Sequence, residues 1–70
     1  MSELTFMISC VEEYKRHKKI SGKDTIKLFE RYSVCEYIKA FYEVLNKNDF
    51  KYIVGDIELY INSKKNPYIY

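Results

Sequence analysis

Apolar side chains recur at spacings of three and four residues through most of this 70-residue chain. That spacing matches the α-helix, in which residues i, i+3 and i+4 share one face. Only two glycines and one proline interrupt the pattern, which leaves little room for linkers or disorder. Because a chain of this length supports one small core, the sequence predicts an all-α fold, a single-core bundle of about four short helices.

The first predicted helix spans residues 2–18. Ser2 or Thr5 can cap its N-terminus, and lysine, arginine and histidine fill residues 15–19, which suits the negative end of the helix dipole. The first half is apolar nearly all round, because two stripes lie side by side. They comprise Leu4, Met7, Ile8, Val11 and Tyr14 in one stripe and Phe6 and Cys10 in the other.

Two serines followed three residues later by an acidic residue predict the next two helix starts. Ser21 begins a second helix that ends near Arg31 or Tyr32 and carries Ile26 and Phe29 toward the core. Ser33 matches the capping box more closely and begins a third helix that continues to residue 45. Its apolar spacing is given by Val34, Tyr37, Ile38, Phe41, Val44 and Leu45.

Residues 46–49 form a polar turn before the last predicted element. Residues 50–54 are aromatic and β-branched, as in a strand, but the continuing helical spacing favours a fourth helix from about Asp49 to Asn62. Gly55 costs this helix about 1 kcal/mol or allows a close contact with another helix. The predicted helical domain therefore covers residues 1–62, and residues 63–70 form an irregular tail.

The ionisable residues form no catalytic or metal-binding constellation, so we expect neither an enzyme nor a cofactor. Glu12 and Glu13 are adjacent on a helix and point about 100° apart, and His17 lies about 10 Å from Cys10 along the same helix. Cys10 and Cys35 are too few for a metal cage, and we expect both to be reduced and buried. No signal peptide or membrane-spanning segment is apparent, which predicts a cytoplasmic protein.

Aromatic residues are the unusual part of the composition, with eight tyrosines and four phenylalanines. Four short helices cannot bury twelve rings completely, so some tyrosines either cover the core with their hydroxyls in water or line a partner surface. A basic cluster on the first two helices adds a second candidate surface. The predicted partner-binding residues are Tyr32, Tyr42, Tyr52, Tyr68, Tyr70, Lys23 and Lys27.

The segment from Thr25 to Phe41 also permits a helix-turn-helix reading, because it joins two short helices. Several features oppose that reading. Phe29 lies where a small residue normally lets the helices cross, and Glu36 would face phosphates. The net charge of +2 is low for a nucleic-acid-binding protein. A small DNA-binding regulator therefore remains the alternative to a protein-binding module.

The order of motifs resembles a family of small, functionally uncharacterised bacterial proteins over residues 4–61. The motifs in this chain are Cys-Val-Glu-Glu-Tyr at 10–14, Ile-Ser-Gly-Lys at 20–23, Leu-Phe-Glu-Arg-Tyr-Ser-Val at 28–34 and Tyr-Ile-Val-Gly-Asp-Ile at 52–57. The chain departs from the family pattern in having Ser33 for glycine and Asn46 for histidine. The loop from Asn46 to Lys51 also lacks the usual glycine.

The resemblance implies a partner, because members of that family are often encoded beside genes for toxins that look like ADP-ribosyltransferases. It thus implies the antitoxin half of a toxin–antitoxin pair. A small helical body with exposed tyrosines and charges that differ along its length suits a stoichiometric protein binder. The sequence therefore predicts a protein-interaction module that occludes a partner protein.

Overall fold

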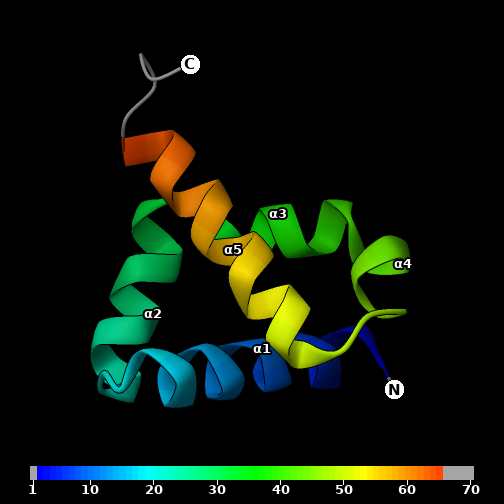
Figure 1. The fold of residues 1–70 in the computed structure, drawn as a ribbon, viewed down its shortest axis with the longest axis horizontal. Coiled ribbons are helices and arrows are strands. Elements are labelled where there is room, and N and C mark those ends of the chain that lie inside the picture. The colour runs from blue at the N-terminus through cyan, green and yellow to red at the C-terminus, as the bar shows by residue number, and fades with distance from the viewer. Residues whose placement is uncertain (1, 66–70) are drawn as a thin grey trace.

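The computed structural model describes residues 2–65 and contains five α-helices in that part of the chain. They are α1 (Glu3–Lys18), α2 (Gly22–Arg31), α3 (Val34–Ala40), α4 (Tyr42–Leu45) and α5 (Phe50–Lys65). Figure 1 shows α1, α2, α3 and α4 around the edge of the molecule, with α5 crossing in front of them. The predicted all-α fold is confirmed, and four of the five helices have seven residues or more.

The first two helices begin where local sequence signals predict. The Ser2 hydroxyl accepts a hydrogen bond from the backbone N–H of Thr5 at 3.1 Å, and Ser21 accepts one from the N–H of Asp24 at 3.0 Å. Each hydroxyl thereby satisfies an N–H group that the helix itself leaves unpaired. These two caps depend only on residues within one turn, which is why the sequence reveals them.

The predicted cap at Ser33 is wrong. Ser33 has a φ of 54°, in the left-handed region, and its side chain makes no capping hydrogen bond to α3. Residues other than glycine pay about 1 kcal/mol for this conformation. The short connection between α2 and α3 requires it, because the chain has only Tyr32 and Ser33 in which to change direction (Figure 1).

The predicted third helix is broken at Phe41. Phe41 has a φ of −112° and ψ of 21°, so α3 ends at Ala40 and the single turn α4 leaves in a new direction (Figure 1). The bend brings the Tyr42 ring edge-on to Phe6 of α1, with ring centroids 5.3 Å apart. Contacts with α1 therefore override a helical pattern that is locally continuous through Leu45.

Helix α5 confirms the helical interpretation of residues 50–54 and extends past the predicted end. It continues through Ser63, Lys64 and Lys65, three residues that the sequence predicts to be irregular. A Cβ added to Gly55 would have nothing within 4 Å, so Gly55 does not permit a close helix contact within the chain. The glycine lies instead on the exposed side of α5.

The stripe of Phe6 and Cys10 enters the core, whereas the other stripe of α1 does so only in part. Tyr14 of that second stripe is buried beside Phe6 and Cys10, but its Leu4 and Ile8 are largely exposed. The buried apolar residues of the other helices pack against the buried side of α1. They are Phe29, Val34, Ile38, Leu45, Ile53, Val54, Ile57 and Ile61.

In α2 the structure corrects one predicted core residue. Phe29 is buried as expected, but Ile26 is exposed and Thr25 takes the inward position. The Thr25 hydroxyl donates a 2.8 Å hydrogen bond to the carbonyl oxygen of Ser21, so its burial leaves no polar group unpaired. Thr25 can therefore be buried at this position, with its methyl group packed in the core.

A tyrosine of α3 joins that helix to α5. The Tyr37 hydroxyl donates a hydrogen bond to the carboxylate of Asp56, and its ring stacks on Tyr60 with centroids 4.2 Å apart. The Tyr60 hydroxyl in turn donates to the carbonyl oxygen of Tyr32 at 2.9 Å. Burial, followed by the bond to Asp56, raises the pKa of Tyr37 to about 12.

The two cysteines differ in their surroundings, although both were expected to be buried. Cys10 is fully buried in α1, and burial raises its pKa to about 12. Cys35 is exposed in α3, because Val34 and Ile38 occupy the inward positions of that short helix. The sequence interpretation is therefore confirmed for Cys10 and wrong for Cys35.

Replacing Ser33 by glycine is expected to stabilise the protein by about 0.5 to 1 kcal/mol, because glycine adopts a positive φ without steric cost. Urea unfolding measures the difference. The control is Ser33→Ala, which retains the strain and should give no gain. Equal stability of the glycine and alanine variants would show that the backbone at this position is not strained.

Removing the Tyr37 hydroxyl by Tyr37→Phe is expected to cost about 1 kcal/mol at neutral pH. Because the folded-state pKa of Tyr37 is raised to about 12, its contribution is complete below about pH 10 and is lost as the pH rises toward 12. The stability gap between wild type and variant should therefore close over that range in urea unfolding. Tyr52→Phe, which removes an exposed hydroxyl and only a minor charge interaction with Tyr37, should retain most of this pH dependence.

Thiol labelling under native conditions should modify Cys35 rapidly and leave Cys10 unmodified, because only Cys35 is exposed. In denaturant both thiols should react. Mass spectrometry of the labelled peptides identifies the modified residue, and native labelling of Cys10 at the same rate would contradict the packing of α1.

Candidate functional site

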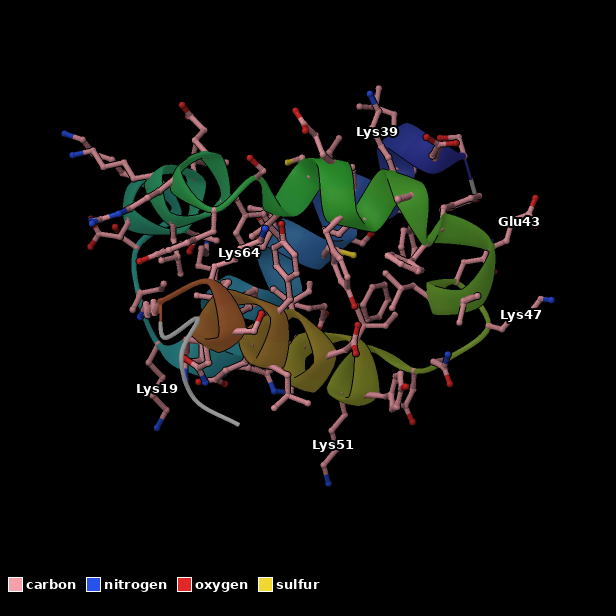
Figure 2. The ribbon with its side chains drawn as sticks, turned by 90° about the horizontal axis from the view of Figure 1, so that it is seen from above. Lys19, Lys39, Glu43, Lys47, Lys51 and Lys64 are labelled. Carbon is pink, nitrogen blue, oxygen red and sulfur yellow. The ribbon has the colours of Figure 1, made fainter. Side chains whose placement is uncertain are left out.

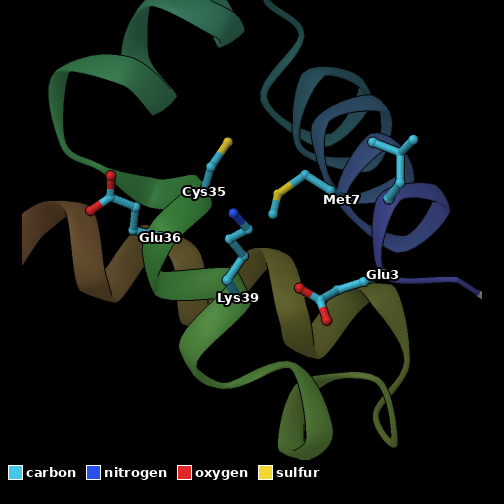
Figure 3. Close-up of a pocket in the computed structure, with 6 residues that line it drawn as sticks. Glu3, Met7, Cys35, Glu36 and Lys39 are labelled. Carbon is cyan, nitrogen blue, oxygen red and sulfur yellow. The ribbon is translucent and has the colours of Figure 1, made fainter.

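An open groove lies on the surface between α1 and α3. It encloses about 500 Å³ and is lined by Glu3, Leu4, Met7, Cys35, Glu36 and Lys39. Figure 3 shows Met7 and Cys35 pointing into the space between the two helices, with α5 behind them. The groove therefore lies on the side of α1 and α3 that α5 does not cover.

A second hollow continues this groove toward α4. It encloses about 310 Å³ and shares Glu3 and Lys39 with the first. Val44, which is 59% exposed, forms part of its wall. We use the name groove surface for the union of the two hollows. Its lining residues are Glu3, Leu4, Met7, Cys35, Glu36, Lys39, Ala40, Phe41, Tyr42, Glu43 and Val44.

Apolar exposure is pronounced on the groove surface. Leu4 is 71% exposed and Phe41 is 50% exposed, although both belong to helical patterns that normally mark a core. Single exposed apolar residues are common on proteins. Several of them around two adjoining hollows are typical of an interaction site.

The charges at the edge of the groove surface are mostly negative. Glu3, Glu36 and Glu43 lie in the first turns of α1, α3 and α4, where a carboxylate stabilises the helix dipole. Lys39 is the one basic residue of the lining, and Figure 2 shows it near the start of α1, with Glu43 projecting from α4. Within residues 2–65, none of these four side chains takes part in an ion pair.

Two of the predicted partner-binding tyrosines are partly buried. Tyr32 packs against the core at the end of α2, with the guanidinium of Arg31 5.6 Å from its ring centroid. Tyr42 packs against Phe6 and also lines the second hollow, so it contributes to the groove surface. Their rings mainly cover the small core, which is one of the two roles that the sequence predicts for such tyrosines.

The other predicted residues that the structure describes do not lie together on one surface. Tyr52 is 54% exposed on the outer side of α5, beside Gly55 and Leu59. Lys23 and Lys27 are exposed on α2. Tyr68 and Tyr70 lie outside the described residues. Among the predicted residues that the structure describes, only Tyr42 lines the groove surface.

The sequence interpretation did not identify Leu4, Met7 and Cys35 as site residues. One signal for them was present: the first half of α1 is apolar nearly all round, and a helix in a small bundle buries only one side. The excess apolar stripe had to face either solvent or a partner. Which stripe does so depends on packing with α5 and is not encoded locally.

Two further findings concern all of the described residues. Among residues 2–65, no group of three or more His, Cys, Asp or Glu side chains is arranged to hold a metal ion. None of the helices in that part of the chain is both long enough and apolar enough to cross a membrane.

Comparison with known proteins gives a family but no functional relative. Neither the curated proteins nor the solved structures give a match. A family model described as "Protein of unknown function (DUF3791)" matches residues 5–64, which include almost all of the five helices and most of the groove surface. The chain therefore belongs to this family of proteins of unknown function.

Proposed function

We propose that this protein is a protein-interaction module that binds and neutralises a partner protein. The observation that carries the proposal is the groove surface, on which Leu4, Phe41 and Val44 are each at least half exposed around two connected hollows. Apolar side chains in such a setting gain free energy when a partner covers them, at about 25 cal/mol per Å² of apolar area removed from water.

The finer proposal is an antitoxin whose partner is a toxin that looks like an ADP-ribosyltransferase. It rests on the resemblance described in the sequence analysis, in which family members are encoded beside such toxin genes. A small rigid body can neutralise an enzyme by covering its substrate site, which requires a surface and no catalytic group. The groove surface supports that mode of action.

The alternative, a DNA-binding regulator that uses α2 and α3, has less support. The exposed side of α3 presents Glu36 and Cys35 and carries Lys39 as its one basic residue. A carboxylate on a reading helix repels phosphates. The basic residues Lys23 and Lys27 lie on α2 and not on the helix that would enter the groove of DNA.

Co-expression of the tagged protein with the product of the gene adjacent to its own tests the proposed function. We expect a stoichiometric complex by size-exclusion chromatography with light scattering, and recovery of growth when both proteins are produced in cells that the partner alone inhibits. An unrelated helical protein of the same size serves as the control.

Either of two results would overturn the proposed function. The first is elution of the two proteins as separate species at micromolar concentration. The second is growth inhibition that persists when the protein is present in excess. A salt-sensitive shift of DNA fragments by the protein alone would instead support the regulator.

A further inference from the structure

We infer that the groove surface receives a cationic amphipathic α-helix of the partner, with its apolar side chains seated between α1 and α3. The inference deepens the proposed function and rests on it, because it names the chemistry of the segment that the protein recognises. Three observations carry it: the walls of the groove, the apolar side chains exposed within it and the charges at its edge.

The walls of the groove require an occupant that satisfies its own backbone hydrogen bonds. Both walls are helices, whose backbone groups are paired within each helix beyond the first turn, so the walls offer no continuous edge of N–H and C=O groups to a neighbouring chain. A strand laid in the groove would leave its own backbone groups without protein partners. A helix pairs these groups internally and presents only side chains, as helix-in-groove complexes do.

The exposed side chains of the groove match the apolar stripe of such a helix. Leu4 and Met7 come from one wall and Cys35 from the other, and Val44 continues the apolar lining over α4. An amphipathic helix presents apolar residues at i, i+3, i+4 and i+7 along one side. Its stripe can therefore lie between α1 and α3, with its ends near Val44 and the first turn of α3.

The charges at the edge of the groove surface favour a basic helix as its occupant. Three carboxylates, Glu3, Glu36 and Glu43, border the groove surface against one lysine, Lys39. Because none of them forms an ion pair within residues 2–65, they are available to a partner. Basic side chains that flank the apolar stripe of the incoming helix would lie opposite this net negative border.

The basic end of α1 in a second copy of this chain is a less suitable occupant. Its basic residues at the end of α1 already pair with its own carboxylates: Lys15 with Glu12, Arg16 with Glu13, and Lys18 with Glu58. Docking that helix end in the groove would require these pairs to break. A separate partner with unpaired basic residues does not have this cost.

Three synthetic helical peptides of about 16 residues, ~24 Å in length, serve as probes. The first has leucine at i, i+3, i+4 and i+7 with lysine on the flanks. The second replaces each lysine by glutamate, and the third replaces each leucine by serine. Fluorescence anisotropy measures binding to the full chain, and amide chemical shifts identify the residues affected. We expect only the leucine–lysine peptide to bind, with shifts centred on α1 and α3.

Two variants with matched controls test the contacts. Leu4→Asn is expected to weaken binding of the leucine–lysine peptide about tenfold. Leu59→Asn should have no effect, because Leu59 is 70% exposed, compared with 71% for Leu4, but lies on α5. Both side chains are largely outside the core, so both variants should fold, which circular dichroism confirms.

The charge variant is Glu36→Gln combined with Glu43→Gln. We expect about fivefold weaker binding and a smaller salt dependence, since two charges at the edge are removed. The control combines Asp24→Asn with Glu12→Gln. It also removes two carboxylates, and Asp24 too lies in the first turn of a helix, but neither residue lines the groove surface.

Several results would overturn the inference. These are equal binding of the lysine and glutamate peptides, chemical shifts centred on the outer side of α5, and a dimer of the protein alone that Leu4→Asn dissociates. The co-expressed complex separates this inference from the proposed function. If the complex forms equally well with Leu4→Asn and with the double glutamine variant, the inference fails and the function stands. If the peptide binds in the groove but no complex forms, the proposed function fails.

Discussion

The packing of α5 against one stripe of α1 determines the rest of the structure. Ile53, Ile57 and Ile61 of α5 belong to the same core as Phe6 and Cys10 of α1. Burial of such side chains is the main source of stability in a domain of this size, where little other apolar surface is available. Because the first half of α1 is apolar nearly all round, burying this stripe leaves Leu4 and Ile8 outside. The groove surface is thus a direct result of the way the core forms.

The parts of the fold that the sequence predicts are those that depend on neighbouring residues. Ser2 and Ser21 cap helices through bonds within one turn, and the helical spacing in residues 50–62 outweighs their β-branched composition. The parts that it does not predict are set by contacts between distant segments. Phe41 interrupts a continuous pattern so that Tyr42 can reach Phe6, a contact that no local signal reports.

The candidate site was less predictable than the fold. Aromatic content correctly indicates that some rings are exposed, but Tyr32 and Tyr42 mostly cover the core, and Tyr52 is exposed on α5 and does not line the groove. Composition alone does not show which apolar side chains remain outside the core. That information comes from the direction in which Leu4 and Met7 project once α1 is packed, which the tertiary contacts determine.

The two sulfur-containing side chains in the groove have a consequence for recognition. Met7 and Cys35 are unbranched and polarisable, and a methionine side chain can change rotamer to fit neighbours of different shape. A lining of this kind tolerates leucine, isoleucine or phenylalanine in the occupant without movement of α1 or α3. In the complex that we propose, discrimination between partners would then fall to the carboxylates at the edge. The docked helix could therefore vary in its apolar residues as long as the positions of its basic residues stay the same.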